Sequence, residues 1–303
     1  MRLATMAAAA FWELALPLPD DAAEGFTNFL WELGALGVVE EHAADGGARL
    51  RGFFAGETPA AALETRINDY LASLRQLGFA AAGAARLVPL EDGRWAEAWR
   101  EHFRPLRVGQ RLLVVPPWEA PSAGDRLTII IDPGRAFGTG HHGSTAGCLE
   151  RLEAIAAEAP PAAAIDLGTG SGILAIAAAR LGVERVLAVD DDPDAVAGAA
   201  ANAALNGVGD RMTCLRADAG AIEASAPLVL ANLLAAAHAR LAPAYRRLVL
   251  PGGRLVLGGI LDGEAATVAA ALRAHDFAEA ATLSVDGWTT LELTGHATLH
   301  AHA

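Results

Sequence analysis

A glycine-rich turn between an apolar strand and an apolar helix constrains this chain more than any other feature. The run Ala162–Ile165 leads into Asp166-Leu-Gly-Thr-Gly-Ser-Gly172, which is followed by the apolar segment Ile173–Leu181. Glycine permits positive φ and lets a ligand approach the backbone N–H groups, since it has no Cβ. The sequence therefore predicts a strand, a tight turn and a helix around a nucleotide-like ligand, with Gly168 and Gly170 as contacts.

Strands and helices alternate from Leu127 to the end, which is typical of a doubly wound parallel sheet. Strands are expected over Leu127–Ile131, Ala162–Leu167, Val186–Asp190, Met212–Ala217, Leu228–Asn232 and Arg254–Ile260. Helices are expected over Ser144–Ala157, Ile173–Leu181, Pro193–Asn206, Ala235–Leu250 and Gly263–His275. The final segments, Ala280–Val285 and Trp288–Leu293, flank an Asp-Gly pair and predict a hairpin. An antiparallel hairpin at the end distinguishes the methyltransferase form of this α/β, Rossmann-like architecture from the dehydrogenase form.

The N-terminal part has a different pattern and predicts a small α+β domain. Extended segments are expected over Phe11–Pro19, Gly37–His42, Arg49–Ala55 and Ala84–Leu90, with helices over Asp20–Leu36 and Thr58–Phe79. This β-α-β-β-α-β order is ferredoxin-like. Because the region holds no catalytic constellation, we interpret it as a recognition module.

A basic segment separates the two patterns. Residues 93–118 contain 5 arginines and 2 acidic residues, while both flanking regions are acidic. Trp95, Trp99 and Phe103 form one stripe of a predicted helix, which either packs on a neighbouring domain or lines a substrate cleft. We therefore expect a recognition domain over 1–90, a connecting helix and linker over 91–124, and a catalytic domain over 125–303.

Charge and composition exclude several classes of protein. A net charge of −13 argues against direct nucleic-acid binding and suits a basic protein substrate. Cys148 and Cys214 lack a partner motif, which favours a reducing, cytoplasmic setting, and no stretch predicts a membrane span. The apolar start resembles a signal peptide, but Glu13 interrupts it. Five histidines, in the loop (141 and 142) and in the tail (296, 300 and 302), lack metal-ligand spacing, so no metal site is expected.

Ligands of doubly wound sheets bind at the carboxyl ends of the strands, where three polar residues stand out. Asp190 follows Gly168 by 22 residues, a spacing at which a carboxylate accepts hydrogen bonds from a ribose diol. Asp218 is an expected acceptor for an adenine amino group. Asn232 emerges from a buried apolar strand, which is costly without a partner, so we place it beside the reacting centre, where it would orient the target group.

The glycine spacing separates two cofactor classes. Dinucleotide oxidoreductases have Gly-x-Gly-x-x-Gly, whereas this chain has Gly168-x-Gly170-x-Gly172 and lacks a second nucleotide half. S-adenosylmethionine is favoured because its activated sulfonium needs little beyond alignment with a nucleophile. Methyl transfer from such a cofactor does not require a catalytic triad, which is compatible with the lack of a Ser-His-Asp or Cys-His arrangement in the sequence.

Several motifs together resemble the ribosomal protein L11 methyltransferases of the PrmA type. They are Trp95-x-x-x-Trp-x-x-x-Phe-x-Pro-Leu-Arg107, Asp132-Pro-Gly-x-Ala-Phe-Gly-Thr-Gly140, Asp166-Leu-Gly-x-Gly-Ser-Gly-Ile-Leu-Ala-Ile176, Val189-Asp-x-Asp-Pro193, Asn202-x-x-x-Asn-Gly-Val208, Ala231-Asn-Leu-Leu-Ala235 and Leu250-Pro-Gly-Gly253. The resemblance covers nearly the whole chain. It departs at residues 141–145, where the family's Thr-His-Pro-Thr-Thr is His-His-Gly-Ser-Thr.

The resemblance implies a cofactor, a partner and site residues. S-adenosylmethionine would contact Thr145, Gly168, Asp190 and Asn232, and Phe137 would lie in the loop that covers it. Lysine side chains and the N-terminal amine of ribosomal protein L11 would be methylated. A monomer is expected. Two alternatives stay open: the same chemistry on another protein lysine or a small amine, and a protein that binds the cofactor without catalysis.

Overall fold

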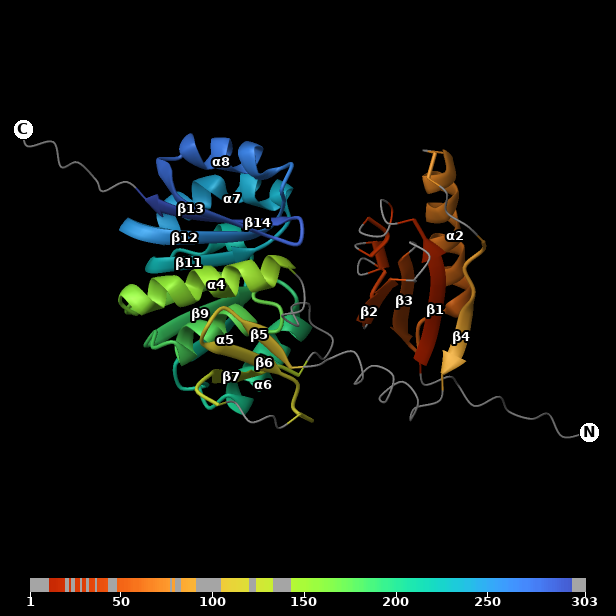
Figure 1. Ribbon diagram of the computed structural model, residues 1–303, viewed down its shortest axis with the longest axis horizontal. Coiled ribbons are helices and arrows are strands. Elements are labelled where there is room, and N and C mark those ends of the chain that lie inside the picture. The colour runs from red at the N-terminus through yellow and green to blue at the C-terminus, as the bar shows by residue number, and fades with distance from the viewer. Residues whose placement is uncertain are drawn as a thin grey trace, which may run out of the picture. The chain divides into compact units, whose positions relative to one another are not determined.

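The computed structural model describes residues 11–19, 22, 25–27, 29–30, 33–35, 37–42, 48–76, 78–79, 83–90, 105–119, 124–132 and 143–295. The chain separates into two compact units, Met1–Phe103 and Arg104–Ala303 (Figure 1). The aromatic stripe of Trp95, Trp99 and Phe103 and the loop residue Phe137 lie outside the described residues. None of the helices in the described ranges is long and apolar enough to cross a membrane.

The first unit is an antiparallel sheet with helices against it. Its strands are β1 (Phe11–Leu18), β2 (Gly37–His42), β3 (Ala48–Ala55) and β4 (Leu87–Leu90), and their order is β2-β3-β1-β4. Helix α2 spans Ala60–Gln76, and the described residues between 22 and 30 are also helical. This order is the predicted ferredoxin-like one.

Alternation along β1 explains why this unit has one core. Leu14, Leu16 and Leu18 are buried at every second position and pack in one cluster with Ile67 of α2. The ring of Phe29 stacks on Tyr70 of α2 with 4.0 Å between centroids, which joins the earlier helical segment to α2. Both helical segments therefore pack on the same face of the sheet.

The second unit contains a seven-stranded sheet of order β10-β9-β8-β11-β12-β14-β13. Its strands are β8 (Ala163–Leu167), β9 (Arg185–Asp190), β10 (Met212–Arg216), β11 (Ala226–Asn232), β12 (Val249–Leu261), β13 (Phe277–Val285) and β14 (Trp288–Gly295). The first five in this order are parallel, and β14 runs antiparallel to both neighbours. The predicted parallel sheet with a closing hairpin is confirmed. Its turn, Asp286-Gly287, has φ of 50° and 82°, which is why this pair occurs there.

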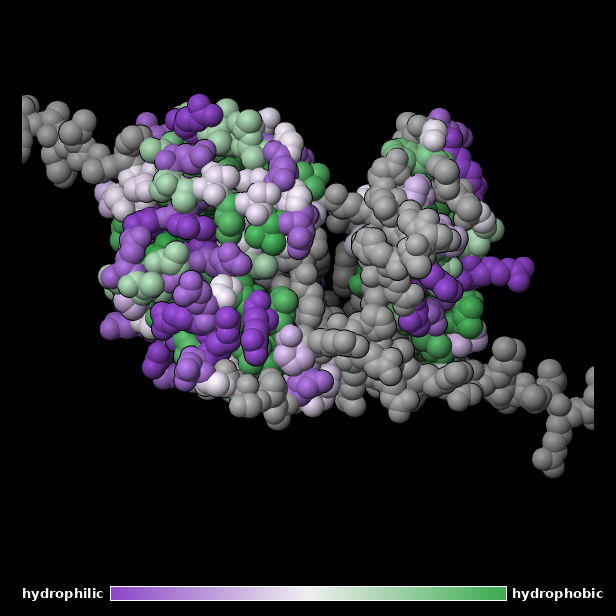
Figure 2. All heavy atoms as spheres, in the orientation of Figure 1, coloured by the Kyte–Doolittle hydropathy of each residue, from purple (hydrophilic) through white to green (hydrophobic). Residues whose placement is uncertain are grey.

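Helices cover both faces of this sheet. One core cluster joins Leu228 and Leu230 of β11 to α4 (Gly143–Glu158) and α5 (Ile173–Arg180). A second joins the alternate residues Val229 and Ala231 to α7 (Ala235–Leu248) and α8 (Ala265–Arg273). Helix α6 (Pro193–Leu205) adds Ala203 to the first cluster. The visible outer face is largely hydrophilic (Figure 2), as expected for helices that turn apolar residues inward.

A separate three-stranded sheet differs from the sequence prediction. Strands β5 (Leu106–Val108) and β6 (Leu112–Val115), from the segment predicted to be a linker, pair with β7 (Leu127–Ile130) in the order β5-β6-β7. The strand predicted over Leu127–Ile131 is present as β7, but its pairing with β6 in a separate sheet was not predicted. In the main sheet, β9 and β11 pair with the two edges of β8, so β7 has no place beside it. The small sheet is held to α4 by Glu153, whose carboxylate accepts hydrogen bonds from the N–H groups of Gln110 and Arg111.

Candidate cofactor site

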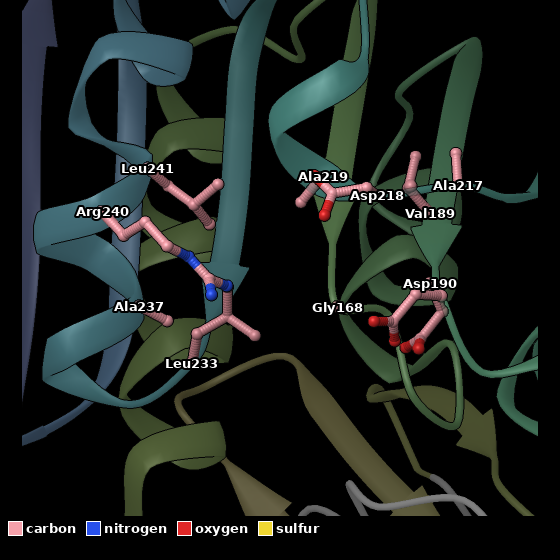
Figure 3. A pocket seen from close by; sticks show the side chains of 11 residues that line it. Gly168, Val189, Asp190, Ala217, Asp218, Ala219, Leu233, Ala237, Arg240 and Leu241 are labelled. Atoms are coloured by element: carbon pink, nitrogen blue, oxygen red, sulfur yellow. The ribbon is translucent and has the colours of Figure 1, made fainter.

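A pocket opens at the carboxyl ends of the central strands, where the strand order changes direction. Strand β8 lies between β9 on one side and β11 on the other, which makes their ends the switch point at which doubly wound sheets bind ligands. Figure 3 shows Asp190 and Asp218 on one wall and Arg240 of α7 on the opposite wall. The lining residues are Gly168, Val189, Asp190, Asp191, Ala217, Asp218, Ala219, Leu233, Ala237, Arg240 and Leu241.

The glycine turn forms the floor of this pocket. Gly168, Gly170 and Gly172 have φ of 66°, 52° and 82°, a region that other residues rarely adopt. A Cβ on Gly168 would lie 2.4 Å from Cδ2 of Leu233, so a larger residue would displace the pocket wall. The positive φ of Gly168 and the closeness of the Leu233 side chain both explain why glycine occupies this position.

Asp166 stabilises the turn from below and does not line the pocket. Its Oδ2 accepts hydrogen bonds from the Thr169 hydroxyl at 2.6 Å and the Ala175 N–H at 3.2 Å. Burial raises the pKa of Asp166 to about 6, although these hydrogen bonds act against that shift. These contacts show that Asp166 orients the turn.

Asp190 ties the second strand to the glycine turn. Its Oδ2 accepts from the N–H of Gly170 at 2.9 Å, and its Oδ1 accepts from the N–H of Asp192 at 3.1 Å. Each carboxylate oxygen has a further lone pair, and the side chain borders the pocket. The carboxylate is thus held in place and can still accept hydrogen bonds from a diol.

Asp218 is positioned by the chain that follows β10. Its carboxylate caps the short helix Ala219–Ala221 and accepts from the N–H of Gly220 at 2.7 Å. It lines the pocket with its neighbours Ala217 and Ala219, at the place predicted for recognition of an adenine amino group.

Asn232 and Thr145 form a second polar group outside the pocket lining. The Nδ2 of Asn232 donates to the hydroxyl of Thr145 at 3.1 Å, and Thr145 is fully buried at the start of α4. The Oδ1 of Asn232 is buried and accepts no hydrogen bond within the described residues. Such an acceptor costs free energy unless a ligand satisfies it. Asn232 immediately precedes Leu233 of the pocket lining but is not itself a lining residue.

His238 was not predicted, and it supports the strand end that carries Asn232. Its Nε2 donates to the carbonyl of Gly258 at 2.8 Å, which leaves Nδ1 to accept from the Tyr245 hydroxyl at 2.9 Å. Gly258 pairs with Asn232 across β11 and β12. Burial lowers the pKa of His238 to about 4, so it is neutral at pH 7 and serves as a fixed donor.

Arg240 and its helical neighbours are also lining residues that the sequence prediction missed. Ala237, Arg240 and Leu241 line the pocket from one side of α7, and Leu233 lines it from the segment between β11 and that helix. The helical spacing of the first three after a strand end at the switch point is a signal that could have identified them.

The cysteines and potential metal ligands add no second site. Both cysteines are free, and burial raises the pKa of the Cys148 thiol to about 12, which makes it unreactive. No group of three His, Cys, Asp or Glu side chains suited to a metal occurs within the ranges that the structure describes. The loop and tail histidines lie outside those ranges.

Comparison with known proteins assigns the family. The family profile described as "Ribosomal protein L11 methyltransferase (PrmA)" matches residues 10–295. The ribosomal protein L11 methyltransferase of Gloeobacter violaceus is 37% identical over 290 residues, covering 93% of this chain and 88% of that protein. The corresponding protein of Trichlorobacter lovleyi is 36% identical over 303 residues, covering 94% and 98%.

A solved structure of a ribosomal protein L11 methylase from Lactobacillus delbrueckii subsp. bulgaricus is 29% identical to this chain. It aligns with a TM-score of 0.59 over 64% of this chain and 100% of that one. The profile match extends over both units, and the two relatives are covered nearly in full. The chain therefore belongs to the ribosomal protein L11 methyltransferase family of the PrmA type.

Proposed function

We propose that this protein transfers methyl groups from S-adenosylmethionine to amino groups of ribosomal protein L11. Family membership supports the activity and the substrate, and the position of Gly168, Asp190 and Asp218 around one pocket at the switch point is the observation that supports the site. The pocket residues fit the cofactor. Gly168 supplies the positive φ that the turn at the pocket needs, and Asp190 and Asp218 offer carboxylates to the ribose hydroxyls and the adenine amino group.

The bound cofactor would supply a methyl group on a positively charged sulfur, and the protein must present a neutral amine to it. Asn232 Oδ1 can accept one N–H of the target amine and so orient the nitrogen lone pair. Thr145 fixes the amide of Asn232 from the other side. Removal from water disfavours the ammonium form, which lowers the pKa of a buried amine. We assign Asn232 to orientation of the amine and Thr145, Gly168, Gly170, Asp190, Asp218 and Phe137 to cofactor binding.

Charge and the first unit support a protein substrate. The net charge of −13 favours a basic partner over nucleic acid. We assign recognition of that partner to the ferredoxin-like unit, whose described residues hold no cluster of metal ligands. Access to a ribosomal protein places the enzyme in the cytoplasm, where the two free cysteines stay reduced.

Intact-mass analysis tests the proposal directly. The purified chain is incubated with methyl-labelled S-adenosylmethionine and ribosomal protein L11, and labelled methyl groups are expected on L11. L11 with acetylated amines is the control and should gain none. Cofactor binding without methylation of L11 would indicate another amine substrate or a protein that binds without catalysis, and either result overturns the assignment.

A further inference from the structure

Two polar residues, Asn202 of α6 and Asn206 at its C-cap, are buried although neither lines the pocket. Asn202 and Asn206 are 2% and 7% exposed, and their spacing of four residues places them on one face of the helix. They belong to the motif Asn202-x-x-x-Asn-Gly-Val208, which the cofactor site does not use. A buried amide is costly unless it is hydrogen-bonded, so its partners indicate its purpose.

Asn206 acts as a substitute for a neighbouring strand. Its Oδ1 accepts from the N–H of Ile130 at 2.8 Å, and its Nδ2 donates to the carbonyl of Ile130 at 2.6 Å. Strand β7, which ends at Ile130, is the outer strand of the small sheet, so this side has no strand partner. The side-chain amide therefore satisfies both backbone groups of one residue.

Asn202 makes the same pair of hydrogen bonds with Asp132, two residues after Ile130, and it also makes a third. Its Oδ1 accepts from the N–H of Asp132 at 2.9 Å, and its Nδ2 donates to the carbonyl of Asp132 at 3.3 Å. Positions i and i+2 of a strand are roughly 6.6 Å apart, and positions i and i+4 of a helix are roughly 6 Å apart. The two amides thus match alternate peptides of the β7 segment.

The third bond distinguishes Asn202 from Asn206. Its Nδ2 also donates to the carbonyl of Ser171 at 2.9 Å, and Ser171 lies in the glycine turn between Gly170 and Gly172. Asn206 instead bonds the carbonyl of Asn202 on its own helix, at 2.8 Å. Asn202 alone of the two connects the end of β7 to the turn below the pocket.

We propose that Asn202 is a positioning residue for cofactor binding, which holds the glycine turn in register with Asp132. The inference rests on the proposed cofactor site. Without the amide, the N–H and carbonyl of Asp132 and the carbonyl of Ser171 each lose a partner. The turn can then shift, and the N–H of Gly170, which bonds Asp190, shifts with it. Weaker cofactor binding follows although Asn202 itself lies outside the pocket lining.

Asn206 provides a matched control, because its removal also takes two bonds from β7. Asn202→Ala and Asn206→Ala are compared in the full-length chain by calorimetric titration with S-adenosylmethionine and by urea unfolding. We expect similar shifts of the unfolding midpoint, about tenfold weaker cofactor binding for Asn202→Ala, and less than about threefold for Asn206→Ala. The KM for S-adenosylmethionine should rise in Asn202→Ala while the KM for L11 stays unchanged.

Equal cofactor affinity in the two variants overturns the inference and leaves the proposed function intact. Failure of the unsubstituted chain to bind S-adenosylmethionine overturns both. If Asn202→Ala does not fold, Asn202→Ser and Asn206→Ser are compared in the same way, because a serine hydroxyl keeps one donor at smaller volume. The same difference in affinity is expected, and its absence rejects the positioning role.

Discussion

Buried carboxylates lie on two strands of the seven-stranded sheet, Asp166 on the central β8 and Glu292 on β14 beside the hairpin edge, but their surroundings differ. At the hairpin end, Glu292 of β14 is fully buried and pairs with Arg151 of α4 and Arg254 of β12. At the switch point, Asp166 is also buried, yet no arginine of the described residues pairs with it or with Asp190. Hydroxyl and backbone N–H donors satisfy Asp166 instead.

The comparison suggests two different roles: the charge of Glu292 stabilises the fold, whereas the charges of Asp166 and Asp190 lie near the proposed ligand site. At the hairpin end the negative charge is neutralised within the chain, and the resulting contacts join α4 to the last strands. At the switch point no arginine of the described ranges forms an ion pair with Asp166 or Asp190. We expect these carboxylates to favour a ligand with a positive centre, such as the sulfonium of the proposed cofactor.

The largest expected effect on stability comes from removing the negative charge of Glu292. Glu292→Gln leaves two arginines without their carboxylate, and the free energy of unfolding should fall by about 3–5 kcal/mol. Urea unfolding measures this loss, and calorimetry should show unchanged affinity for S-adenosylmethionine. A loss below about 1 kcal/mol would show that the network at the hairpin end is not architectural.

The raised pKa of Asp166 should make the free energy of unfolding depend on pH. The pKa of Asp166 is raised from 3.8 to about 6, so its contribution to stability is complete below about pH 4 and is lost as the pH rises through 6. Two pKa units correspond to about 2–3 kcal/mol. Relative to the unsubstituted chain, Asp166→Asn should therefore gain about that much stability between pH 4 and pH 7.

Unfolding by urea at several pH values measures this gain. His238, whose pKa is lowered to about 4, makes the fold more stable as the pH rises over the same range, so only the difference between the two chains isolates Asp166. A difference that does not change with pH would mean that Asp166 is not buried as a free carboxylate.

Asp190 should affect binding and leave the fold intact. Asp190→Asn removes a charged acceptor from the pocket, so affinity for S-adenosylmethionine should fall about 10- to 100-fold, and the unfolding midpoint should change little. Asp194→Asn, which removes the same charge from the first turn of α6, is the control and should keep its affinity. Equal affinity of the two variants would contradict the ribose assignment.

The smallest effect is expected at the exposed edge of the hairpin network. Glu158 pairs with Arg254 at 2.7 Å, but its side chain is 64% exposed. Glu158→Gln should lower the free energy of unfolding by less than about 1 kcal/mol, measured by urea unfolding beside Glu292→Gln. A loss as large as that of Glu292→Gln would mean that pairing with Arg254, and not burial, determines the stability of this network.

Local patterns were sufficient to predict most of the fold. Alternation in β1, the glycine turn after β8 and the Asp286-Gly287 hairpin each have a physical cause within a few residues of chain. The partner of strand β7 was not predicted, since a strand of four residues carries no information about its partner. The pairing of β5 and β6 with β7 depends on contacts such as that between Glu153 and Gln110, which are 43 residues apart.

The same limit applies to the site. Gly168, Asp190 and Asp218 could be found because each lies at or just after the carboxyl end of a strand of the sheet, and the structure brings them to one pocket. The bonds of Asn202 to Asp132 span 70 residues, and the tautomer of His238 depends on Gly258 and Tyr245. No spacing rule connects residues that meet only after the chain has folded.

The amides of α6 have a further consequence for how this chain behaves among its own copies. An outer strand with free N–H and carbonyl groups is a template for pairing with another chain. Asn206 and Asn202 occupy those groups on Ile130 and Asp132, so this edge of β7 is closed to a second molecule. Loss of both amides would remove this protection from the folded chain. Aggregation would then be the first sign of their loss.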